Sequence, residues 1–266
     1  MNATEFFDHL WKDYTSSTPQ AQVIHDAFVR RGDKVVNDHV AFRTLALEPI
    51  GLEALEPHLF AVGYKRYEPY EFPEKKLRAW GYTSDAPEAP RVFLSELLTD
   101  QLSDASAAIL RRMASEVDPG RVESPDVLWS GRLWSPVTLD EYETLRAESE
   151  YAAWMATMGI RPNHFTISVN DLDSADSVEG VLKVVEELGY GVNDSGGRVK
   201  GSPEQLLEQG STLADKAPTQ FAGGETRDTP TCYYEFAKRY PDENGKLFQG
   251  FVATSASRIF ESTDAK

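Results

Sequence analysis

The chain has 266 residues, of which 41% are hydrophobic and 26% charged, and this ordinary composition excludes a disordered or collagen-like protein. Its 27 basic and 43 acidic residues give a formal net charge of −16, which opposes contact with nucleic acid or an anionic membrane. The single cysteine, Cys232, excludes an internal disulfide, and no apolar run nears the roughly 18 residues of a membrane span. We therefore expect a soluble cytoplasmic protein with neither a nucleic-acid nor a membrane partner.

The N-terminal part, residues 1–36, is expected to form two helices. Apolar residues recur there at helical spacing, and a threonine–proline pair at 18–19 provides a cap and a first-turn proline for the second helix. A short strand is expected at 38–44, and an amphipathic helix follows that ends at Gly63. A first module, 37–117, is then completed by three strands and a helix, expected at 65–70, 77–83, 91–97 and 100–117.

Residues 118–160 are expected to connect this module to the rest of the chain. The stretch 118–136 is rich in Gly, Pro and Trp and is long for a plain connection, so we interpret it as a hinge or as part of a lid. Thr138 and Glu141 then form the pattern of a capping box, which predicts the start of another helix.

An internal repeat begins at 163–169, where a second strand opens with a histidine. His39 precedes a Gly-Tyr pair by 24 positions and His164 precedes a second such pair by 25, with an amphipathic helix between them in each case. Further strands are expected near 191–199, 211–214, 219–221 and 231–238. The second module and C-terminal strands would thus cover 161–266.

The repeat predicts an α+β fold, and we expect residues 1–266 to form a single domain. Two βαβββ-type modules would join their strands into a curved, barrel-like mixed sheet, with additional helices outside it. A duplicated module of this kind encloses a shared concave centre, which is where a ligand would bind.

The polar side chains of the repeat are expected to face this centre, because alternate residues of a strand point to the same face. His39 and Arg43 share one face of the first strand, and His164 opens the second strand. Glu96 and Glu235 offer a carboxylate in the last strand of each module. We expect His39, Glu96, His164 and Glu235 to converge, with Arg43 nearby.

Two imidazoles and a carboxylate form a ligand set that leaves positions open on ferrous iron, although the same donors also suit zinc or manganese. A guanidinium such as that of Arg43 matches a carboxylate through two parallel hydrogen bonds, so the implied substrate is an acid. The alternative is structural: hydrogen-bonded histidines, glutamates partnered by arginine, and Arg43 as the counter-ion of Glu96.

At these residues the chain resembles the 2-oxoadipate dioxygenase/decarboxylase family, which is similar to the vicinal oxygen chelate superfamily. The resemblance implies an Fe(II) enzyme that takes a 2-oxo diacid and dioxygen and releases carbon dioxide. From 2-oxoadipate the product would be 2-hydroxyglutarate, a step of lysine degradation. The motifs that carry the resemblance lie at 37–44, 91–97, 163–166, 206–215, 234–239 and 251–260.

The resemblance also implies roles for individual residues. His39, His164 and Glu235 would be the iron ligands, and Arg43 would hold the substrate carboxylate. Thr254 and Ser255 would lie next to the substrate. Glu96 matches a family motif and is expected beside the metal site without binding the metal.

Two rival functions fit the same residues. A zinc or nickel isomerase or lyase of the same superfamily would keep the fold and need no dioxygen. A protein that binds a small acid without turning it over would keep only the cavity. The sequence leaves open the oligomeric state, with a homo-oligomer as one outcome.

Overall fold

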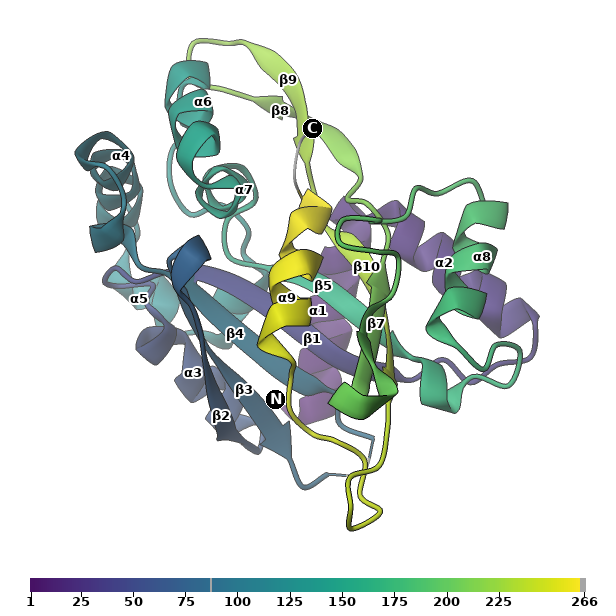
Figure 1. The fold of residues 1–266 in the computed structure, drawn as a ribbon. Coiled ribbons are helices and arrows are strands. Elements are labelled where there is room, and N and C mark those ends of the chain that lie inside the picture. The colour runs from purple at the N-terminus through teal and green to yellow at the C-terminus, as the bar shows by residue number, and fades with distance from the viewer. Residues whose placement is uncertain (87, 264–266) are drawn as a thin grey trace.

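The computed structural model describes residues 1–86 and 88–263. Within these residues, eight strands form one mixed sheet in the order β2-β3-β4-β1-β5-β10-β7-β6. The sheet is strongly curved, and helices lie on both of its sides (Figure 1). Its strands are β1 Asn37–Leu45, β2 Tyr64–Phe72, β3 Leu77–Ser84, β4 Arg91–Leu97, β5 Pro162–Ser168, β6 Lys200–Ser202, β7 Leu207–Ser211 and β10 Tyr233–Arg239.

The sheet order shows the duplication. β1 pairs in parallel with β4, β5 pairs in parallel with β10, and the two modules join where β1 runs antiparallel to β5. Each module places one helix between its first and second strands, α3 (Leu52–Ala61) in the first and α8 (Val178–Glu187) in the second. The predicted α+β fold of two βαβββ modules sharing one curved sheet is therefore confirmed.

The convex face of the sheet is covered by helices of both modules and of the N-terminus. The helix α1 (Ala3–Ser17) begins at an Asn2–Glu5 capping box, and α2 (Pro19–Arg30) follows it. The outward side chains of β5 pack here: the ring of Phe165 meets that of Trp11 edge-on with centroids 5.1 Å apart. Burial of these apolar faces fixes which strand residues point to the opposite, concave side.

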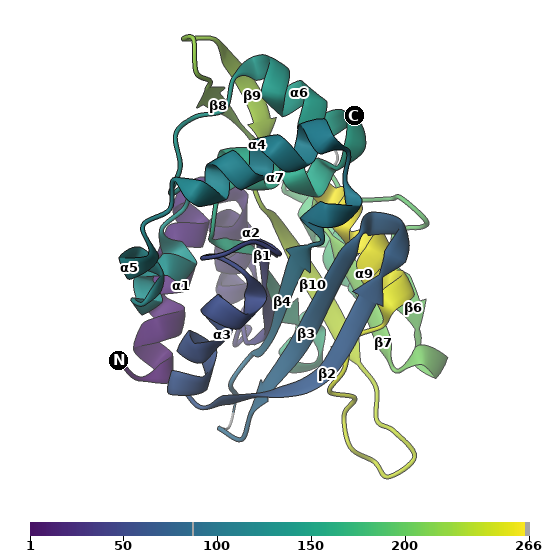
Figure 2. The same cartoon turned by 90° about the vertical axis from the view of Figure 1, so that its left-hand side faces the viewer.

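The segment between the modules is packed rather than lid-like. Helices α4 (Asp104–Ser115), α6 (Leu139–Glu148) and α7 (Glu150–Met158) gather at one end of the sheet (Figure 2). The predicted capping box of Thr138 and Glu141 is present at the start of α6. Residues 118–136 contain the short helix α5 (Pro119–Val122). Four of their apolar side chains are buried and anchor the stretch that we expected to act as a hinge or lid: Val122, Val127, Leu128 and Trp134.

The second module departs from the expected strand positions. Residues 191–199 form a loop instead of a strand, with one isolated bridge between Val192 and Thr212. Gly196 and Gly197 in this loop adopt positive φ angles of 69° and 104°. The strand expected at 211–214 lies earlier, as β7. The hairpin of β8 (Lys216–Gln220) and β9 (Thr226–Pro230) pairs separately from the large sheet.

The last expected strand, 231–238, is present as β10, and the chain then forms the helix α9 (Ala253–Ile259) and a 3₁₀ turn over Phe260–Thr263. Ser255, Ala256 and Ile259 are buried, which is the spacing of a helix face and not of a strand. Figure 1 shows α9 on the opposite side of the sheet from α1, and α9 contacts β2 of the first module and β6 and β7 of the second.

In the part of the chain that the structure describes, we find no helix with the length and apolar character needed to cross a bilayer.

Candidate metal centre

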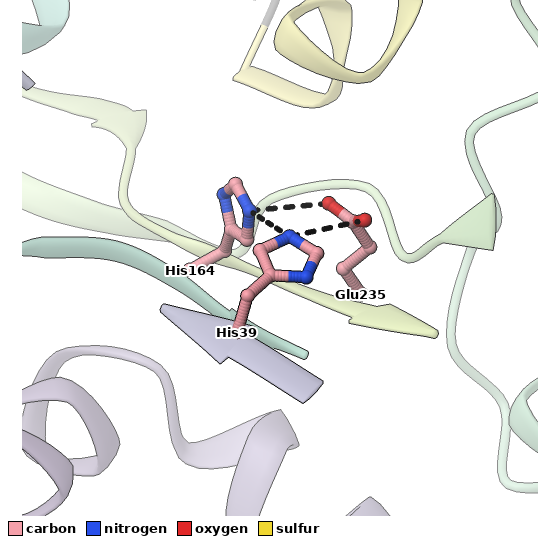
Figure 3. Close-up of side chains that lie close together, drawn as sticks. All are labelled: His39, His164 and Glu235. Atoms are coloured by element: carbon pink, nitrogen blue, oxygen red, sulfur yellow. Dashed lines mark hydrogen bonds and ion pairs between the residues drawn. The ribbon is translucent and has the colours of Figure 1, made fainter. Parts of the chain in front are cut away.

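Three side chains from neighbouring strands meet on the concave face of the sheet (Figure 3). They are His39 on β1, His164 on β5 and Glu235 on β10, and all three are buried. The two Nε2 atoms lie 3.4 Å apart. The carboxylate oxygens of Glu235 lie 3.4 Å from Nε2 of His39 and 3.1 Å from Nε2 of His164. The expected convergence of these three residues is therefore present.

The spacing of these atoms fits a common cation. Ligand atoms at about 2.1 Å from a metal are separated by about 3.0 Å in an octahedral and about 3.4 Å in a tetrahedral arrangement. In addition, Oε2 of Glu235 is buried and has no hydrogen-bond partner among the described residues. A buried carboxylate oxygen without a donor is costly, and a cation would satisfy it.

The electrostatics of the group also favour a cation. Burial, together with the neighbouring His39 and Arg43, holds the pKa of His164 well below its ordinary value, so its imidazole is neutral. Burial raises the pKa of Glu235, whose Oε1 accepts a hydrogen bond of 2.6 Å from Nε2 of Gln209. A neutral imidazole and a carboxylate short of donors are forms that bind a metal.

Each imidazole is oriented by the residue that precedes it in the chain. Nδ1 of His39 lies 2.7 Å from Oδ1 of Asp38, and Nδ1 of His164 lies 3.2 Å from Oδ1 of Asn163. When Nδ1 donates to these oxygens, Nε2 presents its lone pair to the shared point. The sequence reasoning missed Asp38 and Asn163, although an acceptor directly before each histidine was visible in the repeat.

A small cavity adjoins the three side chains. It offers about 20 Å³ to the centres of water-sized molecules, which is room for about one water. Apolar side chains form most of its wall, and the rings of Phe93 and Phe251 meet there with centroids 4.9 Å apart. The lining residues are His39, Ala41, Phe93, His164, Gln209, Glu235, Phe251, Ala256, Ile259 and Phe260.

Arg43 lies on the same strand as His39 but is engaged with internal partners. Its side chain is 1% exposed, and Nη1 is 3.3 Å from a carboxylate oxygen of Glu150. Nη2 donates to Oγ1 of Thr263 at 3.0 Å, and the guanidinium lies over the rings of Tyr151 and Trp154. Arg43 is thus buried behind the cavity wall rather than part of it.

Glu96 does not join the group, so the expected fourfold convergence is wrong. Its Oε2 accepts from the backbone N–H of Leu52 at 2.8 Å, and its other oxygen pairs with Arg78. The structure therefore does not place Glu96 beside the metal site, and Arg43 is not the counter-ion of Glu96. Its partners place it at the start of α3, away from the concave face.

The strand register explains the error. In the first module Ala41 is paired with Phe93, and in the second Thr166 is paired with Glu235. Because Ala41 and Thr166 each lie two residues after the histidine, the counterpart of Glu235 is Phe93 and not Glu96. The first module therefore contributes one ligand candidate to the site and the second contributes two.

The two residues expected next to the substrate do not line the cavity. Thr254 is exposed. Ser255 is buried against β6: a Cβ atom added to Gly201 of that strand would lie 3.2 Å from the Oγ of Ser255. The wall is formed from α9 by Ala256 and Ile259 instead. These apolar residues carry no chemical signal in the sequence and could be found only from the orientation of the helix.

Comparison with known proteins gives a consistent result. The sequence profile of the 2-oxoadipate dioxygenase/decarboxylase family matches residues 6–121 and 126–246. The chain is 38% identical over 277 residues to the chloroplastic/amyloplastic 2-oxoadipate dioxygenase/decarboxylase of Oryza sativa, covering 95% of this chain and 76% of that one.

Solved structures show the same fold. The hydroxyglutarate synthase of Oryza sativa in complex with 2-oxoadipate is similar with a TM-score of 0.90 and 34% identity, covering 98% of this chain and 91% of that one. A protein from Shewanella frigidimarina, provisionally described as a hydrolase, is similar with a TM-score of 0.89 and 42% identity, covering 94% of this chain and 98% of that one.

Proposed function

The chain belongs to the 2-oxoadipate dioxygenase/decarboxylase family, and from this membership we propose that it is an Fe(II)-dependent enzyme that converts 2-oxoadipate and dioxygen to 2-hydroxyglutarate and carbon dioxide. The atoms balance, since both oxygen atoms of dioxygen are retained in the two products. The observation that supports the proposal most strongly is the meeting of His39, His164 and Glu235 at one buried point.

We assign the metal to these three residues. Ferrous iron bound by two imidazoles and one carboxylate has open positions for a chelating 2-oxo acid and for dioxygen, and it supplies the electron chemistry. Donor type alone also fits zinc or manganese, so the choice of iron rests on the family. The protein holds the three donors in a dry, buried place, which strengthens electrostatic interactions there.

Arg43 is proposed to hold a carboxylate of the substrate. Its guanidinium presents two parallel donors, and its Nε has no partner in the described part of the chain. The carboxylate of Glu150, at 3.3 Å, occupies one of these donors in this structure. Binding of an acid to Arg43 therefore requires that the substrate replace Glu150, so this glutamate would compete with the substrate.

The cavity must enlarge before a 2-oxo diacid can enter. A space of about 20 Å³ is far below the roughly 300 Å³ of the smaller ligand pockets in proteins. The strands that carry the metal group are the central strands of the sheet, whereas Ala256, Ile259 and Phe260 belong to one short segment near the chain end. We propose that this segment, α9 and the following turn, moves away when the substrate binds.

The test is anaerobic loading with Fe(II), followed by measurement of oxygen uptake and carbon dioxide release with 2-oxo diacids of different length. We expect one dioxygen and one carbon dioxide per 2-oxoadipate. The variant Arg43→Lys keeps the charge but loses the planar fork, so it should retain iron while kcat/KM falls by about tenfold or more.

The rival functions give different results in the same assay. A zinc or nickel isomerase or lyase, or a hydrolase, would turn over substrate without consuming oxygen. A binding protein would retain the acid and release no carbon dioxide. The cytoplasmic location stays a prediction; the free, buried thiol of Cys232 is compatible with a reducing compartment.

A further inference from the structure

A buried ion pair lies directly behind one of the proposed metal ligands. Nδ1 of His39 is 2.7 Å from Oδ1 of Asp38. The Asp38 carboxylate in turn accepts two parallel hydrogen bonds from Arg239, from Nε to Oδ2 at 2.7 Å and from Nη2 to Oδ1 at 2.9 Å. Asp38, His39 and Arg239 are 4%, 2% and 2% exposed, so water does not compete for these contacts.

The geometry fixes the direction of the hydrogen bond to the imidazole. Both oxygens of Asp38 accept from the guanidinium of Arg239, which can only donate, so the carboxylate acts as an acceptor. The atom of His39 that faces it must therefore carry a hydrogen. Its other nitrogen, Nε2, then carries a lone pair that faces the hydroxyl of Thr166 at 3.1 Å as well as His164 and Glu235.

Arg239 also holds the wall of the cavity. Its Nη1 donates to the backbone oxygens of Phe248 at 3.0 Å and Gly250 at 2.7 Å. Its guanidinium lies 5.4 Å from the ring centroid of Phe251, and that ring meets the ring of His39 edge-on at 5.0 Å. One arginine thus fixes the acceptor behind the imidazole and an aromatic ring beside it.

We propose that Asp38 and Arg239 are positioning residues of the metal site: Asp38 holds His39 in the tautomer and orientation that turn Nε2 toward the metal, and Arg239 holds Asp38. The inference rests on the proposed function only in that His39 is taken as a ligand. Carboxylates that accept from a metal-bound histidine generally orient the ring and raise its affinity for the metal.

The repeat supplies an internal comparison. In the second module Asn163 occupies the position of Asp38, and the distance from its Oδ1 to Nδ1 of His164 is 3.2 Å instead of 2.7 Å. The shorter distance is typical of a hydrogen bond to an ionised acceptor. The variant Asp38→Asn would therefore give the first module the arrangement that the second module already has.

The first readout uses the metal-free protein. Long-range ¹H–¹⁵N correlation spectra of the imidazoles report which ring nitrogen carries the hydrogen, and the chain has five histidines, so His39 can be assigned by comparison with His39→Ala. We expect the Nδ1–H form in the wild type, loss of this preference in Asp38→Ala, and its partial retention in Asp38→Asn.

The second readout is the dissociation constant for Fe(II) or Co(II), measured by competition with a chelator. Asp38→Ala should bind the metal about 10–100-fold more weakly, and Asp38→Asn should lose less. The matched control is Glu56→Gln, which breaks another bidentate ion pair, that of Glu56 with Arg66. This control should change neither the tautomer of His39 nor the metal affinity.

The inference is overturned if folded Asp38→Ala keeps the wild-type tautomer of His39, or binds the metal within twofold of the wild type. If Asp38→Ala does not fold, the double variant Asp38→Asn/Arg239→Gln replaces the ion pair by an amide pair and is judged by the same two readouts. If the wild type binds no metal, the metal site itself is refuted, and the tautomer measurement still decides the role of Asp38.

Discussion

Replacing Glu235 by glutamine should stabilise the metal-free protein while removing its metal site. Glu235 and Glu96 are both buried glutamates, at 0% and 1% exposure, but their surroundings are opposite. Glu96 is paired with Arg78 and accepts a backbone N–H. Glu235 has one donor, Gln209, and otherwise faces the nitrogens of two imidazoles. The same substitution is therefore predicted to have opposite effects at the two positions.

The magnitude follows from the contacts. A buried acceptor without a partner costs about 1–3 kcal/mol, and in Glu235→Gln an amide N–H can donate to an imidazole nitrogen, so we expect a gain of about 1–3 kcal/mol in the free energy of unfolding. Glu96→Gln loses hydrogen bonds to a charged group and should be less stable by about 1.5–3 kcal/mol.

The gain at Glu235 should depend on pH. Burial raises the pKa of this carboxyl, so the folded protein takes up its proton at a higher pH than the unfolded chain does. The charged form therefore destabilises the fold at neutral pH, and this penalty shrinks as the pH falls toward the ordinary value near 4.5. The difference between Glu235→Gln and the wild type should shrink in the same direction.

The assay is urea unfolding of the wild type, Glu235→Gln and Glu96→Gln at pH 7 in the presence of a chelator, with metal binding measured separately. The reasoning is refuted if Glu235→Gln is less stable than the wild type by more than about 1 kcal/mol, the typical worth of a satisfied hydrogen bond.

Three further predictions concern other parts of the fold. Burial acts to raise the pKa of Glu148, but a hydrogen bond from Lys76 helps hold this pKa at about 2. Glu148→Gln should therefore lower the free energy of unfolding by about 1 kcal/mol at pH 7, and by progressively less as the pH falls from about 4.5 toward 2, as measured by urea titration. Burial raises the pKa of the Cys232 thiol to about 11, so an aromatic disulfide reagent at pH 8 should modify it only at the rate of unfolding. Gly159→Ala should lower the melting temperature much more than Gly189→Ala. Both glycines have positive φ, but a Cβ on Gly159 would lie 2.2 Å from backbone atoms, whereas a Cβ on Gly189 would meet nothing within 4 Å. Equal melting temperatures of the two variants would contradict this prediction.

The duplicated architecture could be predicted because it depends on local patterns. The spacing from His39 to Gly63 recurs from His164 to Gly189, and the helix that precedes Gly189 has a clear apolar face. The same repeat identified two of the three residues of the metal group directly. Glu235 was a candidate as the polar position that the repeat predicts in the last strand of the second module, and its choice over Glu96 as a ligand came from the resemblance to the family.

What could not be predicted depends on pairing between distant residues. The equivalence of Phe93 with Glu235 follows from strand register, which the sequence does not display. The partners of Arg43 are 107 and 220 residues away, at Glu150 and Thr263, so no local pattern indicates them. The helix α9 is short and rich in small residues, and its packing on the sheet decides its conformation.

The central claim is that His39, His164 and Glu235 bind one iron ion. X-ray data collected at the iron absorption edge, from crystals grown anaerobically with Fe(II), would locate that ion directly in an anomalous difference map. We predict a single strong peak per chain within bonding distance of both Nε2 atoms and the Glu235 carboxylate. Iron bound elsewhere, or bound by fewer than two of these three side chains, would contradict the claim.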